Sequence, residues 1–273
     1  MAATGLHPAA ASGLEPSRAQ LARWAVSDAL AMTQRNLLVW LRVPAYIAFT
    51  VVQPVIFVLL FRYVFGGAIP VRNSGGYVDF LMPGIIGQTA AFASFATAIA
   101  LAEGMKQGVI DRLRSIPMAR SAVLAGRLLA DAIRMLITLL VIVAVGFLVG
   151  FRFHNGVLAG TGMVLLAEVF GVVVCCVSGY IGLAIKDQEA VQAFGLIWIF
   201  PLTFVSSAFV PISTMPGWLQ AFAMHQPVTL VIDAMRAMAL GGDIGTPLWQ
   251  SLVWLAGTLA VFGPLAVRAY RRG

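Results

Sequence analysis

The chain has 273 residues, of which 60% are hydrophobic and only 11% are charged, whereas an ordinary soluble domain has about 25% charged residues. This composition excludes a water-soluble enzyme, a disordered chain and a secreted disulfide scaffold, and it indicates a polytopic membrane protein. The net charge is +7, and we attribute it to Lys and Arg gathered on the cytoplasmic side of a membrane rather than to nucleic-acid binding.

The N-terminal part divides into a tail and a helix. Residues 1–20 are rich in Ala, Gly, Ser and Pro, and we expect a loose cytoplasmic tail without a cleaved signal peptide. Residues 21–42 place polar and apolar side chains on opposite arcs at helical spacing, which predicts an amphipathic helix at the membrane interface. A helix packed on the protein's own cytoplasmic surface would show the same pattern, and both placements can hold together.

Six apolar runs follow, each reaching the roughly 20 residues that a helix needs to cross about 30 Å of hydrocarbon. Because backbone polar groups in lipid must bond within their own segment, these runs are predicted to be helices. The fourth run is long enough to tilt or to project beyond the bilayer. The predicted spans are residues 43–65, 80–102, 128–150, 157–185, 190–210 and 248–267.

The positive charges predict the orientation of these spans. Six spans place both chain ends on one side, and with both ends in the cytoplasm 13 of the 18 Lys and Arg residues fall inside and 3 outside. Positive residues favour the cytoplasmic side. The sequence therefore predicts an all-α domain over residues 43–267 with six transmembrane helices, N-in and C-in, followed by a basic cytoplasmic end, 268–273.

The sequence has no motif for nucleotide binding or catalysis. It lacks a phosphate-binding loop, a dinucleotide fingerprint, and the motifs of zinc proteases and serine hydrolases. The three histidines, His7, His154 and His225, do not form a ligand cluster. Adjacent cysteines rarely fit disulfide geometry, and two ligands cannot complete a zinc site, so Cys175 and Cys176 are expected to be small buried apolar residues. We expect no catalytic residue and no metal on this chain.

The segment between the second and third predicted spans contains a short amphipathic helix. Val109, Leu113 and Ile116 share one face, polar side chains occupy the other, and Pro117 ends the helix. Such a helix could present its apolar face to a partner groove, or it could lie on the lipid headgroups as an anchor. The periodicity alone leaves both interpretations open.

Two regions of the sequence contain motifs in a fixed order. The first, directly after the second span, is Glu103-x4-Gly108-x3-Arg112-Leu113-x3-Pro117. The second, before the last span, comprises Phe209-Val-Pro211, Met215-Pro-Gly-Trp218-Leu, Pro227-x-Thr229 and Asp233-Ala-Met-Arg236-Ala. Together these motifs resemble the permease subunits of ABC-2-type transporters, and within them the daunorubicin-resistance branch of drug-export permeases. The similarity covers about residues 40–270 in matching order. The family commonly has Asn before the late proline, where this chain has Gln226.

The resemblance implies a transport subunit rather than an enzyme. It implies a homodimeric permease of a bacterial cytoplasmic membrane that exports a hydrophobic or amphipathic drug, antibiotic or lipid-like compound. Two copies of a separate ABC ATPase would bind ATP and Mg, so the missing phosphate loop is expected. The helix between spans two and three would couple the ATPase to the permease. The implied coupling residues are Glu103, Gly108, Val109, Arg112, Leu113, Arg114, Ile116 and Pro117.

Residues 210–242 are too apolar for a free loop and too interrupted by proline for a span. We predict two short helices that dip into the outer leaflet, which agrees with the re-entrant hairpin that the resemblance implies. Trp218 and Phe222 lie on one apolar stripe, and Asp233 and Arg236 are three residues apart and can pair. A structural plug over the outer mouth and a role in substrate release are equal alternatives for this hairpin.

Three charged residues stand out within the predicted spans. Asp131 and Arg134 are three residues apart near the cytoplasmic face, where snorkelling lowers the cost of charge, and we expect a structural pair rather than a proton relay. Glu168 lies near the middle of span four without an evident partner in the sequence. An intramembrane carboxyl is a functional candidate, although Glu168 could also be protonated or bind another helix.

Aromatic faces with a few uncharged polar groups suit an amphipathic planar or lipid-like substrate, and ordinary helix packing is the alternative explanation. The resemblance places the pathway between spans one, two and five of the two copies. The candidates are Thr50, Gln53 and Phe57 on span one, Gln88, Phe92 and Phe95 on span two, and Phe200, Thr203, Phe204 and Ser207 on span five.

Two rival functions stay open. An ion-gradient-driven secondary transporter would need a coupling-ion site near the midplane and usually has internal repeats, and we see no repeat between residues 43–150 and 157–267. A non-transporting membrane scaffold is the other rival, and the coupling-type helix argues against it.

Overall fold

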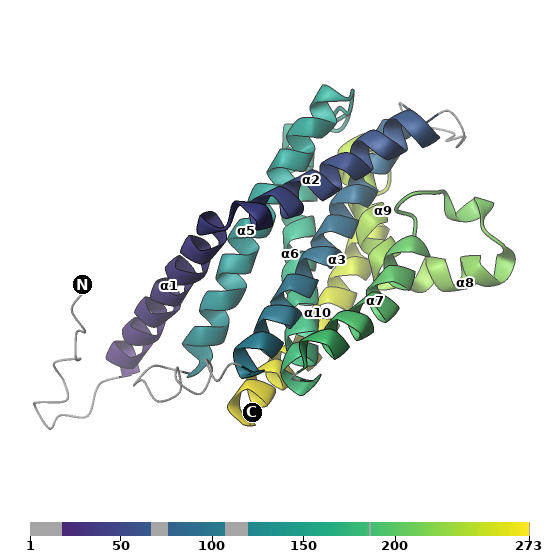
Figure 1. Cartoon of the computed structure of the whole chain (residues 1–273). Coiled ribbons are helices and arrows are strands. Elements are labelled where there is room, and N and C mark those ends of the chain that lie inside the picture. Colours follow the sequence, from purple (N-terminus) through teal and green to yellow (C-terminus); the bar gives the residue numbers. More distant parts are fainter. Residues whose placement is uncertain (1–17, 67–75, 107–119, 186, 273) are drawn as a thin grey trace, which may run out of the picture.

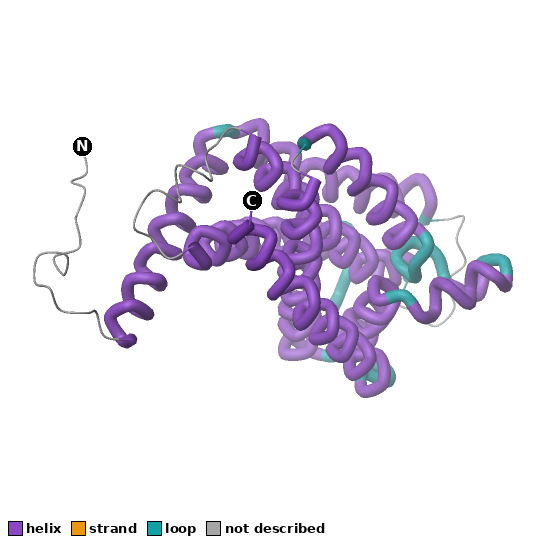
Figure 2. The backbone as a smooth tube through the Cα atoms, turned by 90° about the horizontal axis from the view of Figure 1, so that it is seen from below, coloured by secondary structure: helices purple, strands orange, loops and turns teal. Residues whose placement is uncertain are grey.

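The computed structural model describes residues 18–66, 76–106, 120–185 and 187–272, and this part of the chain is helical apart from short turns (Figures 1 and 2). The helices, in chain order, are α1 (Arg18–Arg42), α2 (Pro44–Leu60, continued by a π-helical turn over Phe61–Phe65), α3 (Tyr77–Lys106), α5 (Arg120–Leu148), α6 (Gly156–Ile185), α7 (Gln188–Phe204), a 3-10 turn (Ile212–Thr214), α8 (Gly217–His225), α9 (Pro227–Leu240) and α10 (Gly245–Arg272).

The long helices run side by side in a bundle, and α2, α3, α5, α6, α7 and α10 alternate in direction along the chain (Figure 1). The end of the bundle that holds Lys106 and Arg268 also holds the C-terminus (Figure 1). We call the opposite end, where α8 and α9 lie, the hairpin end (Figure 1).

Four of the described helices are long and apolar enough to cross a membrane: α3, Ala125–Leu148 of α5, α6, and Gly245–Tyr270 of α10. Helices are also present at the first and fifth predicted spans, but they are shorter. α2 has 17 residues before the π-helical turn, and α7 has 17 residues. All six predicted spans are therefore occupied by helices, and four of those helices reach a membrane-crossing length.

The fifth and sixth predicted spans differ from the helices in their ends. The fifth was expected to reach residue 210, but α7 ends at Phe204 and Val205 adopts non-helical angles (φ −91°, ψ 54°). The Ser206 hydroxyl donates to the Thr203 carbonyl at 2.5 Å and accepts from the Ala208 amide at 3.2 Å, so side-chain bonds replace those of a continuing helix. At the other end of the chain, the sixth span and the expected separate basic segment 268–273 share one helix, because α10 continues to Arg272.

α1 lies along α5 and forms one flank of the bundle (Figure 1). The Thr33 hydroxyl of α1 donates to the Gly126 carbonyl of α5 at 3.1 Å. A Cβ at Gly126 would meet the Ala29 carbonyl oxygen at 2.5 Å, so the close approach of the two backbones requires glycine. The amphipathic segment thus packs on the protein itself. It also exposes apolar side chains such as Val26, which leaves a surface suited to a membrane interface.

α3 and α6 form the centre of the bundle. Gly182 of α6 lies so close to the Ala98 carbonyl of α3 that a Cβ would clash, a small-residue contact of the kind that lets membrane helices approach each other. Large buried side chains from α3, α5, α6 and α9 fill the remaining core. They include Leu81, Met82, Ile85, Ile86, Leu139, Ile142, Met163, Ile232 and Met235.

The two helices of the predicted hairpin occupy different environments. α8 is exposed, with 76% of Trp218 and 51% of Phe222 accessible. α9 packs against α3, α6 and α10, and its residues Val228, Ile232 and Met235 are buried. The two short helices are thus present where the sequence predicted them, with α9 packed against the bundle and α8 exposed, and their depth in the outer leaflet stays a prediction.

Candidate functional site

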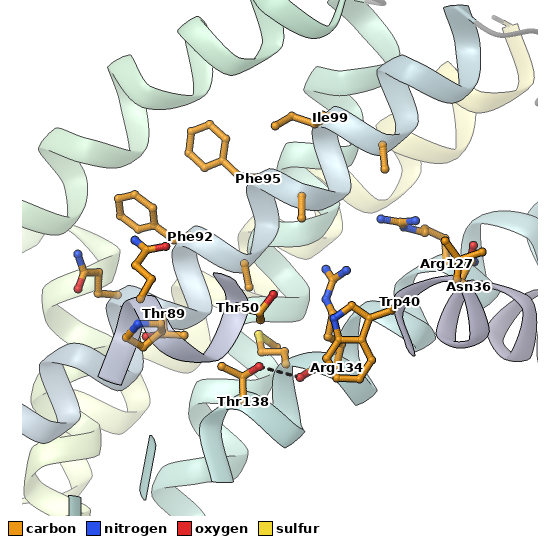
Figure 3. Close-up of a pocket in the computed structure, with 18 of the residues that line it drawn as sticks. Asn36, Trp40, Thr50, Thr89, Phe92, Phe95, Ile99, Arg127, Arg134 and Thr138 are labelled. Carbon is orange, nitrogen blue, oxygen red and sulfur yellow. Dashed lines mark hydrogen bonds between the residues drawn. The ribbon is translucent and has the colours of Figure 1, made fainter. Parts of the chain in front are cut away.

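A cavity of about 600 Å³ lies between α1, α2, α3 and α5 (Figure 3). Its volume is in the range of small-molecule sites, about 300–1,000 Å³. Six of the predicted pathway residues line it, namely Thr50, Gln53, Phe57, Gln88, Phe92 and Phe95. The structure thus brings the chosen faces of the first two spans to one cavity, and their contact with a substrate stays a prediction.

The cavity has two chemically different sides. In Figure 3, Phe92, Phe95 and Ile99 project from α3, whereas Arg127 and Arg134 come from α5. The lining therefore has an apolar, aromatic part on α3 and a cationic part on α5. This arrangement can hold a molecule that has an apolar body and a polar end.

The aromatic residues predicted on three spans form one chain of ring contacts. Phe92 lies between Phe95 and Phe200, with centroid distances of 6.1 and 5.9 Å. From Phe200 the ring contacts continue to Phe204 at 4.4 Å, then to Phe209 at 5.1 Å, Phe61 at 4.6 Å and Phe57 at 6.0 Å between centroids. The sequence analysis did not name Phe61, although it lies four residues after Phe57 on the same face of the first predicted span, nor Phe209, which lies in the turn after α7.

The polar candidates on span five have structural partners. The Thr203 hydroxyl donates to the Ile199 carbonyl at 2.8 Å. The Ser207 hydroxyl donates to Asp233 Oδ1 at 2.6 Å, at the hairpin end. None of the four span-five candidates lines the cavity between α1, α2, α3 and α5, although Phe200 contacts its wall through Phe92.

Asp131 pairs with Arg134 at the predicted spacing, and it binds a second arginine as well. The Asp131 side chain is buried, and its Oδ1 lies 2.9 Å from Arg134 Nη2. Its Oδ2 lies 3.0 Å from Arg127 Nε and accepts from Thr97 Oγ1 at 2.7 Å. Two guanidinium groups share one carboxylate, so this cluster places a net positive charge on the cavity wall. Arg127 lies one residue before the predicted third span, and its pairing with Asp131 was not predicted. The i, i+4 spacing of the two residues does predict such a pair on one helix.

Asp233 and Arg236 also pair at the predicted spacing, with Arg236 Nη1 2.7 Å from Asp233 Oδ1. Arg236 Nη2 donates to the Ser207 carbonyl at 2.6 Å and to the Phe80 carbonyl at 3.2 Å, and the guanidinium lies over the Phe80 ring at 3.9 Å. This arginine therefore ties α9 to the turn after α7 and to the start of α3. Gln226, the departure from the family pattern, is buried and donates to the Val205 carbonyl beside the same turn.

The remaining predicted residues fall into four groups. Glu103 lies near the end of α3 and lines the cavity. Glu168 lies within α6, and its buried Oε2 has no hydrogen-bond partner among the described residues. The thiols of Cys175 and Cys176 are free and buried, as expected. The other coupling residues lie outside the described residues: Gly108, Val109, Arg112, Leu113, Arg114, Ile116 and Pro117.

A metal centre is not formed within the described ranges 18–66, 76–106, 120–185 and 187–272, where no three His, Cys, Asp or Glu side chains gather to hold an ion. The lining of the cavity offers aromatic, amide, hydroxyl, guanidinium and carboxylate groups, which can bind and orient a molecule.

Comparison with known proteins places the chain in a family. Residues 28–240 match the family described as ABC-2 type transporter. The chain is 35% identical over 264 residues to the daunorubicin resistance ABC transporter permease protein DrrB1 of Streptomyces coeruleorubidus, which covers 95% of this chain and 90% of that protein. It is 32% identical over 258 residues to the probable doxorubicin resistance ABC transporter permease protein DrrC of Mycobacterium tuberculosis, covering 94% and 93%.

A more distant relative gives the same result. The inner membrane transport permease YadH of Escherichia coli is 27% identical over 220 residues, which covers 78% of this chain and 82% of that protein. The relatives are bacterial transport permeases, and the long apolar helices described above suit a multi-pass membrane protein. The chain therefore belongs to the ABC-2 type transporter family, as a transport permease of the bacterial cytoplasmic membrane.

Proposed function

We propose that this chain is the membrane-spanning subunit of an ATP-driven exporter and moves a hydrophobic or amphipathic compound, such as a drug, an antibiotic or a lipid-like molecule, out of the cell. The observation that carries the proposal is the cavity of about 600 Å³ between α1, α2, α3 and α5, with its aromatic and cationic walls. Relatives named for daunorubicin and doxorubicin resistance support a compound of this kind.

The family implies an ABC ATPase as partner. In the proposed assembly, two copies of that ATPase hold ATP and Mg, and two copies of this chain form a homodimer. The apolar stretch of α10 is only 11% buried within the chain, so it offers a large surface to lipid or to a second copy. The six-span, N-in and C-in topology is supported by the alternating helix directions and by the distribution of positive charge.

Coupling to the ATPase is proposed to run through the segment 103–120. Its first residue, Glu103, lines the cavity, and its last, Arg120, begins α5, which supplies the cationic wall. A partner that moves this segment would therefore act on two elements of the cavity at once. The proposed docking helix is therefore adjacent in the sequence to a residue that lines the cavity.

The main test replaces the phosphate-loop lysine of the partner ATPase. Export of a tracer drug from cells should fall to the background of cells without the permease, because this chain has no nucleotide site of its own. Membrane levels of the permease serve as the control. Export that continues in the variant, driven by a proton gradient, would identify a secondary transporter instead.

A second test concerns the coupling helix. Burying Leu113 in a partner groove contributes roughly 1.5–3 kcal/mol, and an unpaired carboxylate there costs several kcal/mol. Leu113→Asp should therefore weaken ATPase docking by about two orders of magnitude or more. Arg114→Ala is the matched control, with a loss of at most about 1 kcal/mol. Normal co-purification of the ATPase with Leu113→Asp would favour a headgroup anchor.

A third test concerns topology. Single cysteines at Ser115 and Ser213, in a background without Cys175 and Cys176, are exposed to an impermeant thiol reagent in intact cells. Ser213→Cys should be labelled and Ser115→Cys should be protected until the membrane is broken. Labelling of Ser115→Cys from outside would contradict the N-in orientation.

A further inference from the structure

The Trp40 side chain contributes an unused hydrogen-bond donor to the cavity. Trp40 comes from α1, only 9% of it is exposed, and it lines the cavity between α1, α2, α3 and α5. Its indole Nε1 has no hydrogen-bond partner within the part of the chain that the structure describes. Buried polar groups are nearly always hydrogen-bonded, so this N–H marks a place where an acceptor is missing.

Two arginines supply further donors on the same side. Arg127 and Arg134 both line the cavity, and each directs one nitrogen to Asp131, through Nε of Arg127 and Nη2 of Arg134. A guanidinium carries five N–H groups, so donors remain on each arginine for a molecule in the cavity. In the view of Figure 3 the Trp40 and Arg134 side chains overlap, and Arg127 lies farther along α5.

Acceptors on this side are few. Asp131 is buried behind the two arginines, and its two oxygens already accept from Arg127, Arg134 and Thr97. Glu103 is the one acidic residue that lines the cavity within the described ranges, and it is already engaged in an interaction. The Thr138 hydroxyl is itself directed to the Arg134 carbonyl at 3.1 Å. A cationic group would meet two guanidinium groups here, whereas an oxyanion would meet donor side chains from Trp40, Arg127 and Arg134.

We propose that Trp40, Arg127 and Arg134 form a subsite for an anionic group, a phosphate or a carboxylate, at one end of an amphipathic ligand. Guanidinium groups bind such oxyanions with paired, charge-assisted hydrogen bonds, and the indole N–H adds a third donor. The apolar body of the ligand lies along the aromatic part of the lining, at Phe92, Phe95 and Ile99 of α3. This inference rests on the proposed export function and deepens it, because it gives the transported molecule a negatively charged end.

The test measures binding rather than export. The full-length permease, purified with its ATPase in phosphatidylcholine nanodiscs, is titrated by fluorescence anisotropy with two pyrene-labelled amphiphiles that share one alkyl chain. One ends in a phosphate monoester and the other in a trimethylammonium group, and empty nanodiscs supply the background. The phosphate probe should bind about tenfold more tightly or better. Equal affinities, or a preference for the cationic probe, would overturn the subsite.

Two variants locate the preference. Arg134→Gln should bring the two affinities to within about twofold of each other. Trp40→Phe keeps the ring and removes only the N–H, so it should weaken the phosphate probe about threefold and leave the cationic probe unchanged. Arg268→Gln, at an exposed position near the end of α10, is the control and should retain the wild-type preference. If Arg134→Gln does not assemble, Trp40→Phe decides alone, and unchanged phosphate binding by that variant would refute the proposal.

Two further measurements complete the test. One distinguishes a lipid-like anion from free phosphate, and the other distinguishes failure of the subsite from failure of the proposed export function. Millimolar inorganic phosphate should not displace the phosphate probe, since the apolar wall contributes to binding, and displacement at equal affinity would mean a site for free anions instead. Binding needs no ATP hydrolysis, so the preference should persist when the partner's phosphate-loop lysine is replaced. Loss of export in that variant bears on the proposed function alone, and a missing preference with normal export refutes the subsite alone.

Discussion

The bundle contains two Asp–Arg pairs with the same i, i+3 spacing, and the surroundings of each pair give it a different role. At the hairpin end, Arg236 binds Asp233, the carbonyls of Phe80 and Ser207, and the face of the Phe80 ring. On the cavity wall, Arg134 binds Asp131, and the structure assigns its guanidinium no other hydrogen bond among the described residues. One arginine uses its donors on the protein, and the other presents them to a cavity.

This difference shows how one sequence feature serves stability in one place and binding in another. A charge inside a membrane protein must be paired or solvated. The Asp233–Arg236 pair meets that need by linking α9 to α3 and to the turn after α7, so it holds segments together. The Asp131 cluster has a second arginine, and its surplus positive charge faces a space large enough for a ligand. The number of partners, rather than the spacing, separates the two roles.

The largest effect is expected from Arg236→Ala. The substitution removes the donor to two backbone carbonyls and leaves Asp233, whose side chain is 38% exposed, with Ser207 as its donor, so the loss should be about 2–4 kcal/mol. The variant should accumulate poorly in membranes and unfold at a much lower temperature in detergent, followed by tryptophan fluorescence. Arg268→Ala, at an exposed position, is the control. Equal stability of the two variants would mean that the hairpin end is held by apolar packing alone.

An intermediate effect on stability is expected from Arg134→Gln. Asp131 keeps Arg127 and Thr97 as partners, and the cavity admits water, so the loss should be about 1–2 kcal/mol. Export should fall more severely than stability, because a cavity-lining donor is removed. Thermal unfolding and export at matched membrane levels measure the two effects. A stability loss as large as that of Arg236→Ala would show that the Asp131 pair is also mainly a structural link.

The smallest effects are expected when the hydroxyl group that donates a hydrogen bond to each aspartate is removed. Ser207→Ala removes the donor to Asp233, which then keeps only Arg236, and should cost about 1–1.5 kcal/mol. Thr97→Val removes the donor to Asp131, which keeps two arginines, and should cost about 0.5–1 kcal/mol. Unfolding midpoints of the two variants, measured side by side, give the order. The reverse order would indicate that the Asp131 cluster depends on its hydroxyl more than on its second arginine.

Much of the fold could be predicted from local patterns. Apolar run length located helices at all six predicted spans, because a run of that length has few other stable forms in lipid. The ends were less accurate. α7 stops at Phe204 because Ser206 and the distant Gln226 bond the backbone of the following turn, and apolar composition does not record such bonds. The burial of α9 also depends on tertiary contacts, since its apolar stripe looks the same against lipid as against protein.

The candidate site was predictable where it rests on helix geometry alone. Thr50, Gln53 and Phe57 share a helical face, so their common cavity follows from spacing. Trp40 was assigned to an amphipathic helix at the membrane interface, and nothing in its periodicity shows that α1 lies along α5 and closes the cavity. That placement comes from the contact at Gly126, between residues far apart in the chain. The Phe61–Phe209 ring contact was hidden for the same reason.

The contact at Gly126 also has a mechanical consequence. α1 is locked to α5 by close backbone packing and by the Thr33 bond, and only Val43, at φ −115° and ψ 87°, separates α1 from α2. Force applied to the first turns of α5 is therefore carried into α1 and across this joint into α2. The Phe92 and Phe95 wall belongs to α3, which is locked to α6 at Gly182. Because α5 packs in a common core with α3 and α6, movement of α2 about this joint would change the width of the cavity while the core stays packed.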